Sequence, residues 1–289
     1  MQSKCTYFSA FTITCNNRLI EFSRPCVMGI LNATTDSFYD GGRHNDDEAL
    51  VGHACWLLDE GADIIDVGVV SSRPGAQLLP PDEEARRLSH VVQLLRQHLP
   101  EGTLLSVDTC YAAPAEAAVA AGADIINDIS GGQFDDAMFA TVARLRVPYV
   151  LSHTRGLPSE MQNLTHYDDL VREVQYYFSK HLDKLYDMGV ADVILDPGFG
   201  FAKTLEQNYE LLNHLDDICT TFRQPLLAGL SRKSMIYKAL NCTPDEALYG
   251  TTVLNTIALQ RGARLLRVHD PRPARQAIEL CRLTAFENK

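Results

Sequence analysis

Polar side chains of several kinds stand at the ends of eight short apolar runs in this 289-residue chain. Carboxylates and amides hydrogen-bond to polar ligands, whereas Lys, Arg and His side chains bind anions. One such end would carry little information, but a complete set predicts a shared binding site. The residues at these ends are Asn32, Asp66, Asp108, Asn127, His153, Asp196, Ser231 with Lys233, and Arg267 with His269.

Two of these ends have the spacing of an anion site. Residues two apart on a strand point to the same side, so Arg267 and His269 point together, and Ser231 shares a side with Lys233. Arg232 points to the opposite side, where we expect a structural ion pair. We therefore place an anion site at Ser231, Arg267 and His269.

The stretch ILDPGFGFAK at 194–203 raises a different expectation. Its spaced glycines look like a loop that cradles phosphate through backbone amides. Asp196 stands at the mouth of this loop, and a carboxylate repels phosphate. The loop is therefore predicted to bind a ligand group other than phosphate.

The apolar runs also predict the elements that position these groups. Short, continuously apolar runs are typical of strands buried on both faces, as in parallel sheets. Helical patterns lie between them, for example at 46–62, 80–99 and 167–188. Eight alternating units predict a (β/α)8 TIM barrel, with a doubly wound open sheet as the alternative. The runs are 27–32, 63–68, 104–108, 124–129, 148–153, 192–198, 225–231 and 265–270.

The barrel prediction brings the polar ends together at one mouth. In this fold the C-terminal strand ends carry the active site, and the loops after the seventh and eighth strands often bind phosphate. No linker interrupts the chain, so we expect one domain over residues 1–289. Residues 1–25 alternate like a strand pair that turns at Asn16 and Asn17, and we expect this hairpin extension to cover the bottom of the barrel.

Composition excludes several classes of protein. The formal net charge of −11 argues against nucleic-acid binding, which needs a basic face. No run approaches the roughly 18 apolar residues of a membrane span, and the N-terminus lacks the long apolar segment of a signal peptide. The eight cysteines are scattered without a C-x-x-C pair, which favours reduced thiols over disulfides or zinc. We expect a cytoplasmic protein that binds neither nucleic acid nor membranes.

Seven motifs in order give the chain a family resemblance. They are GILNATTDSFYDGG, DVG with SSRPGA, SVDT, INDI, LDPGFGFAK, LSRKSM and RVHD, from about residue 27 to 270. With these motifs the chain resembles the dihydropteroate synthases, the pterin-binding TIM-barrel family. The resemblance implies condensation of 6-hydroxymethyl-7,8-dihydropterin pyrophosphate with p-aminobenzoate in folate biosynthesis. It also implies release of pyrophosphate, a requirement for Mg2+ and a homodimer.

The resemblance assigns roles to the residues that match the motifs. The pterin site it implies is Asp108, Asn127, Asp196, Phe201 and Lys233, where the Asp196 carboxylate accepts two neighbouring N–H groups of the ring edge. The pyrophosphate site it implies is Asn32, Ser231, Arg267 and His269, with Asn32 also offering an oxygen to Mg2+. The residues implied in catalysis are Asp36, Asp108, Lys233, Arg267 and His269.

The implied p-aminobenzoate site lies on two loops that depart from the family pattern. Its residues are Phe38 of the first loop and Ser71, Ser72, Arg73 and Pro74 of the second, with Asp36 nearby. The departures are Ala33 and Thr35 for Val and Pro, and Val69, Val70 and Ser72 for Gly, Glu and Thr. Ser152 and Thr154 likewise stand where the family often has methionine. The loop changes leave kinetic competence and sulfonamide sensitivity open.

Two other functions share this pterin pocket. A methyltetrahydrofolate-dependent methyltransferase needs Asp108, Asn127 and Asp196 but not Arg267 with His269. A non-catalytic pterin-binding paralogue would bind the pterin pyrophosphate without turnover. Asp66 and His153 also have a structural interpretation, as buried groups that hydrogen-bond within the barrel.

Overall fold

Eight parallel strands close into a barrel in the computed structural model, which describes residues 10–33, 43–70 and 79–284. The strand order around the barrel is β10-β3-β4-β5-β6-β7-β8-β9. Each predicted apolar run overlaps one strand, so the (β/α)8 barrel is confirmed and the open sheet is wrong. The strands are β3 (Cys26–Asn32), β4 (Ile64–Gly68), β5 (Leu104–Asp108), β6 (Ile125–Asp128), β7 (Tyr149–Ser152), β8 (Val193–Asp196), β9 (Leu226–Ala228) and β10 (Ala263–Val268).

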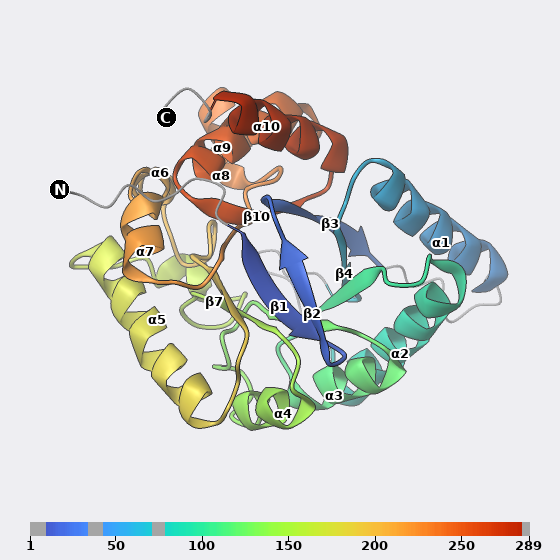
Figure 1. Cartoon of the computed structure of the whole chain (residues 1–289). Coiled ribbons are helices and arrows are strands. Elements are labelled where there is room, and N and C mark those ends of the chain that lie inside the picture. The colour runs from blue at the N-terminus through green and yellow to red at the C-terminus, as the bar shows by residue number, and fades with distance from the viewer. Residues whose placement is uncertain (1–9, 34–42, 71–78, 285–289) are drawn as a thin grey trace.

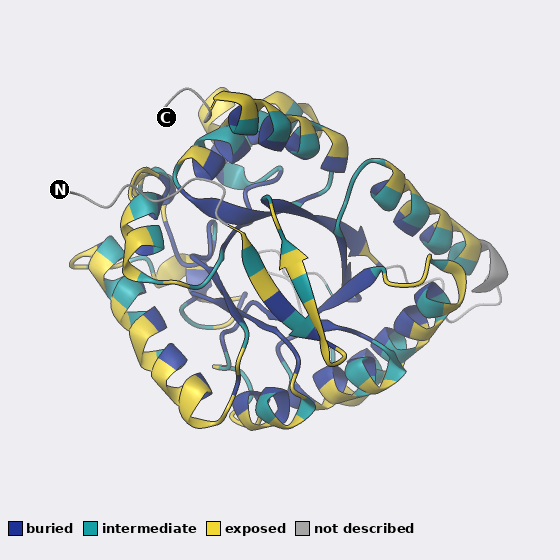
Figure 2. Ribbon diagram, in the orientation of Figure 1, coloured by how far each residue is buried: buried dark blue, intermediate teal, exposed yellow. Residues whose placement is uncertain are grey.

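Helices surround the barrel and bury one face each against it (Figures 1 and 2). The three predicted helical patterns correspond to the first, second and fifth helices below. In the described part of the chain, two short 3-10 helices, η2 (Met161–Asn163) and η3 (Asp245–Ala247), lie in the loops. The helices are α1 (Arg43–Asp59), α2 (Pro81–His98), α3 (Ala112–Ala121), α4 (Met138–Leu145), α5 (Leu170–Asp187), α6 (Leu205–Asn213), α7 (Leu215–Thr221), α8 (Ser234–Leu240), α9 (Leu248–Gln260) and α10 (Pro271–Thr284).

A two-stranded antiparallel sheet crosses the bottom of the barrel, as expected (Figure 1). Its strands are β1 (Phe11–Cys15) and β2 (Arg18–Phe22). Asn16 and Asn17 join them with φ of 51° and 58°, the left-handed pair that a tight type I′ turn requires. Ile13 and Cys15 of β1 are buried in one apolar cluster with side chains from all eight barrel strands, so the hairpin closes this end.

Each barrel strand alternates between the barrel interior and the outer core beneath the helices. On β8, Ile194 belongs to the interior apolar cluster, whereas Val193 and Leu195 belong to the outer cluster. The interior cluster fills the lower half of the barrel with two side chains from β3 and one from each other barrel strand. These side chains are Cys26, Met28, Ile64, Leu104, Ile125, Val150, Ile194, Leu227 and Leu265.

Two expectations about the cellular environment have different outcomes. Six cysteines of the described residues are free thiols, as predicted. Cys219 is disulfide-bonded, so the prediction of reduced thiols is wrong at that position. Among the described residues, no helix is both long enough and apolar enough to cross a membrane.

Candidate active site at the carboxyl end of the barrel

The polar site residues occupy the interior positions directly above the lower apolar cluster. Because side chains two apart share a side, a polar residue two positions after an interior apolar residue also points inward. Six strands show this step, with the lower residue named first. The pairs are Ile64 and Asp66, Leu104 and Ser106, Ile125 and Asn127, Val150 and Ser152, Ile194 and Asp196, and Leu265 and Arg267.

A charged cluster forms where these side chains meet. The Arg267 guanidinium donates to Asp66 Oδ2 through Nε at 2.6 Å and to Asp108 Oδ2 through Nη2 at 2.7 Å. Asp66 also accepts from Ser106 Oγ at 2.6 Å and from Asn127 Nδ2 at 3.0 Å. Asp66 is fully buried, so it holds Arg267 and Asn127 in place from within the barrel.

One cation therefore serves two buried carboxylates. Burial raises the pKa of Asp108 to about 7, and the charges of Asp66, Glu84 and Asp128 add to this against the opposing effect of Arg267. The two aspartates in turn raise the pKa of Arg267 above its ordinary value, although burial opposes them. The guanidinium thus stays charged, and Asp108 is the member of the cluster that titrates near neutral pH.

Ser231 and His269 meet at the rim beside this cluster. Ser231 Oγ lies 3.0 Å from His269 Nδ1, and the His269 backbone N–H donates to the same oxygen at 3.2 Å. Asn32, at the end of β3, is exposed on the rim. These three residues stand at the ends of β3, β9 and β10, which are neighbours in the barrel.

Arg232 points away from the site, as predicted. Its guanidinium pairs with Asp270 at 2.9 and 3.0 Å and with Asp245 at 3.3 Å. The bidentate bond to Asp270 raises the pKa of Arg232. Its ion pairs therefore join the loop after β9 to the end of β10 and to η3.

The glycine loop after β8 turns through three left-handed residues. Gly198, Gly200 and Ala202 have φ of 71°, 82° and 48°. A Cβ at Gly198 would lie 1.9 Å from the backbone oxygen of His153, so only glycine fits there. Asp196 Oδ1 accepts from the Gly198 N–H at 2.8 Å, which orients the carboxylate at the mouth of the loop.

Lys233 reaches this loop from the segment that follows β9, the neighbour of β8 in the barrel. Its Nζ donates to the Phe199 carbonyl oxygen and lies 4.7 Å from the centre of the Phe201 ring. Burial lowers the pKa of Lys233 to about 8, although Asp196 opposes the shift. Lys233, Asp196 and Phe201 thus bring a cation, an anion and an aromatic face to one place.

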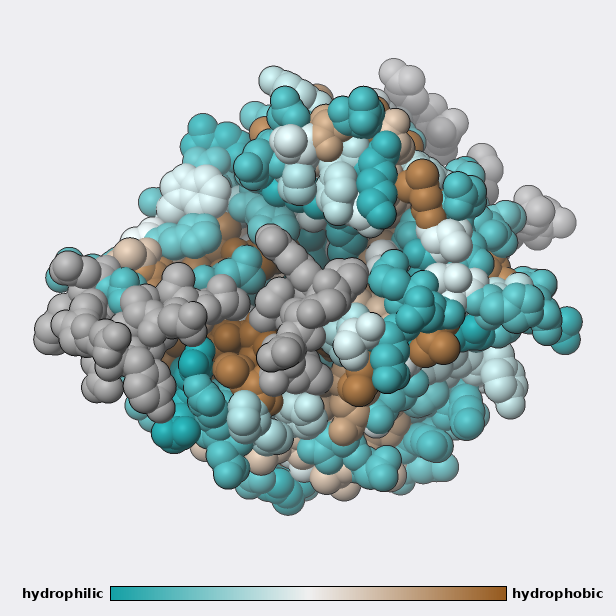
Figure 3. All heavy atoms as spheres, turned by 180° about the vertical axis from the view of Figure 1, so that it is seen from behind, coloured by the Kyte–Doolittle hydropathy of each residue, from teal (hydrophilic) through white to brown (hydrophobic). Residues whose placement is uncertain are grey.

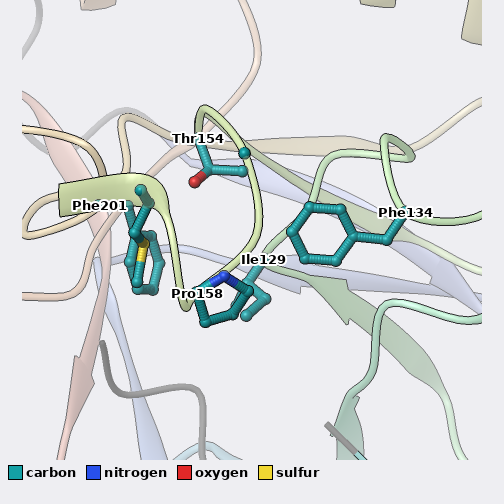
Figure 4. Close-up of a pocket in the computed structure, with 7 residues that line it drawn as sticks. Ile129, Phe134, Thr154, Pro158 and Phe201 are labelled. Atoms are coloured by element: carbon teal, nitrogen blue, oxygen red, sulfur yellow. The ribbon is translucent and has the colours of Figure 1, made fainter. Parts of the chain in front are cut away.

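An apolar pocket continues the site beside Phe201. Ile129 and Thr154 line it at the interior positions two beyond Asn127 and Ser152. Figure 4 shows the rings of Phe201 and Phe134 on either side of Ile129 and Pro158. Figure 3 shows this end of the barrel, where hydrophobic side chains gather near the middle of a hydrophilic face. The lining residues are Ile129, Phe134, Thr154, Gly156, Pro158, Met161 and Phe201.

His153 does not join the mouth, so that part of the convergence prediction is wrong. It is one residue past Ser152 and therefore points outward, where its ring packs edge-on against Tyr177 with centroids 4.9 Å apart. Its Nδ1 lies 3.1 Å from Nζ of Lys203. Burial and the Lys203 charge keep the pKa of His153 well below its usual value, which gives a neutral structural histidine.

Sequence reasoning gave no role to two residues of this region. Ser152 faces the interior beside Asp196, with which it is paired in register, and its buried hydroxyl has no hydrogen-bond partner among the described residues. Counting two positions from Val150 would have identified it. Lys203 is almost completely buried behind the glycine loop, and only its place at the end of that motif marks it.

The implied arylamine loops lie mostly outside the described residues. Val69 is described and packs into the outer apolar core with a backbone that is not left-handed, so valine needs no strain there. Val70 packs partly against the same core. The expected residues outside the described ranges are Thr35, Asp36, Phe38, Ser71, Ser72, Arg73 and Pro74.

Comparisons with known proteins agree with this geometry. Residues 28–269 match the model of the family described as pterin binding enzyme. A dihydropteroate synthase of Synechocystis sp. is 44% identical over 250 residues, which cover 86% of each chain.

Solved structures give the same answer. Dihydropteroate synthase from Yersinia pestis, solved with a sulfonamide drug complex, superposes with a TM-score of 0.87 at 39% identity, covering 95% of this chain and 99% of that one. The Xanthomonas albilineans enzyme with 4-aminobenzoic acid gives 0.85 at 39% identity, covering 94% and 97%. The barrel, the charged interior and these relatives together show that the chain belongs to the dihydropteroate synthase family of pterin-binding enzymes.

Proposed function

We propose that this chain condenses 6-hydroxymethyl-7,8-dihydropterin pyrophosphate with p-aminobenzoate to give 7,8-dihydropteroate and pyrophosphate. The observation that carries the proposal is the pairing of two chemically different ends in one mouth. Asp196, Lys233 and Phe201 suit a flat heterocycle, and Ser231 with His269 suits an anion. The substrate joins a pterin to a pyrophosphate, so it needs both ends.

The heterocycle end answers the question that the glycine loop raised. The 2-amino-pyrimidinone edge of a pterin presents two adjacent N–H groups, which one carboxylate accepts well. Asp196 takes this role, and Lys233 donates to a ring acceptor. The Phe201 ring and the apolar pocket beside it supply the walls that a flat aromatic ligand needs.

The anion end takes the leaving group. The carbon–oxygen bond to pyrophosphate breaks and its electron pair leaves with the oxygen. The amine nitrogen of p-aminobenzoate forms the new carbon–nitrogen bond and loses its proton to solvent. Ser231, Arg267 and His269 are the described groups that stabilise the departing charge by preorganised hydrogen bonds and cations.

We also propose that the reaction uses Mg2+ with Asn32 as a protein ligand. The neutral, exposed side-chain oxygen of Asn32 at the rim is chemically suited to Mg2+, which takes oxygen ligands and shares substrate phosphates. The described residues hold no group of three or more His, Cys, Asp or Glu side chains placed to bind a metal. The ion would therefore take its other ligands from pyrophosphate and water, and it would lower the charge of the leaving group.

The decisive experiment measures pyrophosphate release with both substrates and Mg2+. Release that depends on p-aminobenzoate supports the synthase. Tight binding of pterin pyrophosphate without release would instead indicate the non-catalytic paralogue. Methyl transfer from methyltetrahydrofolate would indicate the methyltransferase.

We further propose a cytoplasmic homodimer. Four large apolar side chains are exposed on α9 and α10, namely Tyr249, Val253, Leu280 and Leu283. A second copy of the chain would bury them, and the six free cysteines suit a reducing compartment. Sedimentation of the wild type and of Val253→Asp tests the dimer, because a charge at the centre of the interface should produce monomers. Cell fractionation tests the compartment.

A further inference from the structure

Side chains hold every carbonyl oxygen of the glycine loop from residue 198 to residue 202. A loop with alternating left-handed residues turns its carbonyls in different directions, and the described backbone supplies a donor to one of them, from the Phe201 N–H to the Gly198 oxygen at 3.1 Å. The donors come from three different segments of the chain. The pairs are Lys203 with Gly198 at 2.9 Å, Lys233 with Phe199, Gln162 with Gly200 at 3.2 Å, Lys203 with Phe201 at 3.0 Å, and Tyr167 with Ala202 at 3.1 Å.

The two lysines of this set lie on opposite sides of the loop. Lys233 lies in the mouth over the Phe201 ring, where the proposed function gives it a ligand to bind. Its bond to the Phe199 oxygen is then given up when the ligand arrives. Lys203 lies behind the loop, is only 3% exposed, and bonds to two loop carbonyls and to His153. Lys203 can therefore keep these hydrogen bonds when a ligand enters or leaves the mouth of the barrel.

We propose that Lys203, paired with His153, is a positioning residue that fixes the glycine loop of the heterocycle pocket in both of its own protonation states. The inference rests on the proposed function only in naming the heterocycle as a pterin. By holding the Gly198 and Phe201 carbonyls, Lys203 fixes the Phe201 ring and the turn beside Asp196. It touches no substrate atom.

The hydrogen bonds balance in either protonation state. As an ammonium, Lys203 donates to two carbonyl oxygens and to the unprotonated Nδ1 of His153. As a neutral amine it still donates to both carbonyls, and its lone pair accepts from His153 once the imidazole proton moves to Nδ1. A neutral histidine is the partner that allows this exchange, because it can carry its proton on either nitrogen.

The surroundings support this exchange near neutral pH. Burial lowers the pKa of Lys203 to about 7, with Asp196 opposing the shift and with Lys233 and Arg155 adding to it. His153 also faces Tyr167 and Tyr177, and His181 acts on it at longer range. Of these groups only Asp196 is a carboxylic acid. Its carboxylate bonds to the Gly198 N–H rather than to Lys203.

The first test separates the two ends of the site in one variant. Lys203→Met should weaken binding of 6-hydroxymethylpterin by at least about tenfold, since the Phe201 carbonyl loses its donor and the Gly198 carbonyl loses one of its two. Binding of inorganic pyrophosphate with Mg2+ should stay within about twofold, because Ser231 and His269 bond to each other at the rim, at the ends of β9 and β10. Lys180→Met, the same change on the exposed face of α5, is the matched control and should alter neither. Equal losses for both ligands, or none, would overturn the inference.

The second test uses the wild-type protein and does not depend on a variant with altered binding. Nitrogen-15 NMR of the imidazoles, with the His153 signals assigned by His153→Gln, should show Nδ1 unprotonated at pH 6 and protonated at pH 8. The ring should stay neutral throughout. Conversion of His153 to a doubly protonated imidazolium near pH 6 would exclude the exchange. If the wild-type protein binds no pterin at all, the proposed function is wrong, but the NMR result for His153 is not affected.

Discussion

The lower and upper halves of the barrel interior are built on the same strands and differ completely in chemistry. The lower half is an apolar layer closed by the hairpin, with Ile64, Ile125 and Ile194 fully buried. Two residues further along the same strands, the upper half carries Asp66, Asn127 and Asp196. A shift of one alternating step, about 7 Å along a strand, thus separates the part that stabilises the fold from the part that binds the ligand.

This contrast shows which part of the barrel interior is unfavourable to bury. Apolar burial in the lower half stabilises the barrel without any need for specific partners. The upper half instead buries Asp66 completely and Asp108 almost completely, with Arg267 as their shared cation. Replacement of buried ion pairs by apolar groups often leaves a protein as stable or more so, so this cluster is best explained by function.

The largest expected effect comes from removing the shared cation. Arg267→Ala should lower the free energy of unfolding at pH 8 by about 3–5 kcal/mol, because Asp66 and Asp108 are left buried and unpaired. The loss should be smaller at pH 5, because the pKa of Asp108 is already raised to about 7 and its protonation removes the repulsion. Urea unfolding at both pH values measures this.

The same variant tests the role of Arg267 in binding. Pterin pyrophosphate should lose far more affinity than plain pterin, and equal losses would place Arg267 outside the anion site. Arg144→Ala is the control, since Arg144 pairs with Glu116 on the surface. Its loss should change stability by less than about 1 kcal/mol.

A change in the lower half should act on stability alone. Ile194→Ala should cost about 2–4 kcal/mol of unfolding free energy, because it opens a cavity in a closed apolar layer. The folded enzyme should bind pterin within about twofold of the wild type, since the cavity lies one layer below the site. If calorimetry shows a large loss of pterin affinity under conditions where the variant is fully folded, the two halves are coupled.

The matched change in the upper half should affect ligand binding much more than stability. Asp196→Asn should weaken pterin binding by about 100-fold, because an amide presents one acceptor oxygen where the ring edge offers two N–H groups. Its unfolding free energy should change by less than about 1 kcal/mol, since one oxygen still accepts from Gly198. Unchanged pterin affinity would refute the role given to Asp196.

The smallest effect concerns a buried carboxylate outside the site. Burial raises the pKa of Glu84, on α2, from its ordinary 4.5 to about 7. Because the raised pKa belongs to the folded state, stability from this group is lost as the pH rises toward 7. Glu84→Gln should therefore increase the unfolding free energy by roughly 1–2 kcal/mol at pH 8 and by much less at pH 5.

Thermal unfolding of Glu84→Gln at the two pH values checks this prediction. Glu101→Gln, the same substitution at an exposed position, is its control. Glu84 lies on α2, outside the barrel interior, so the substitution should act on catalysis only through the pKa of Asp108, which the Glu84 charge helps to raise. A loss of activity with Glu84→Gln would extend the functional half of the molecule beyond the barrel interior.

The strands and their alternation follow from local sequence, and so did most of the site. The two-residue step from Ile194 to Asp196 is readable in the chain, as is the left-handed turn at Asn16 and Asn17. The same counting rule places His153 outside the mouth. The prediction places His153 at the mouth because it is the last polar residue of its run. It does not take into account which side of the strand His153 faces.

Contacts that depend on barrel closure or on loop conformation could not be predicted from the sequence. Arg267 and Asp66 are 201 residues apart, and their contact exists only because β10 pairs with β3 to close the barrel. The roles of Lys203 and Lys233 depend on left-handed turns that end the strand alternation. No periodicity shows which way a side chain points after such a turn.

The hairpin across the bottom has a kinetic consequence. A barrel with a sealed floor has a single entrance, so whatever occupies its deepest layer must enter first and leave last. In the proposed reaction the pterin lies deepest, against Asp196, and the second substrate comes in above it. The arrangement implies compulsory-order kinetics. The pterin substrate binds first, and p-aminobenzoate then binds above it and blocks its exit.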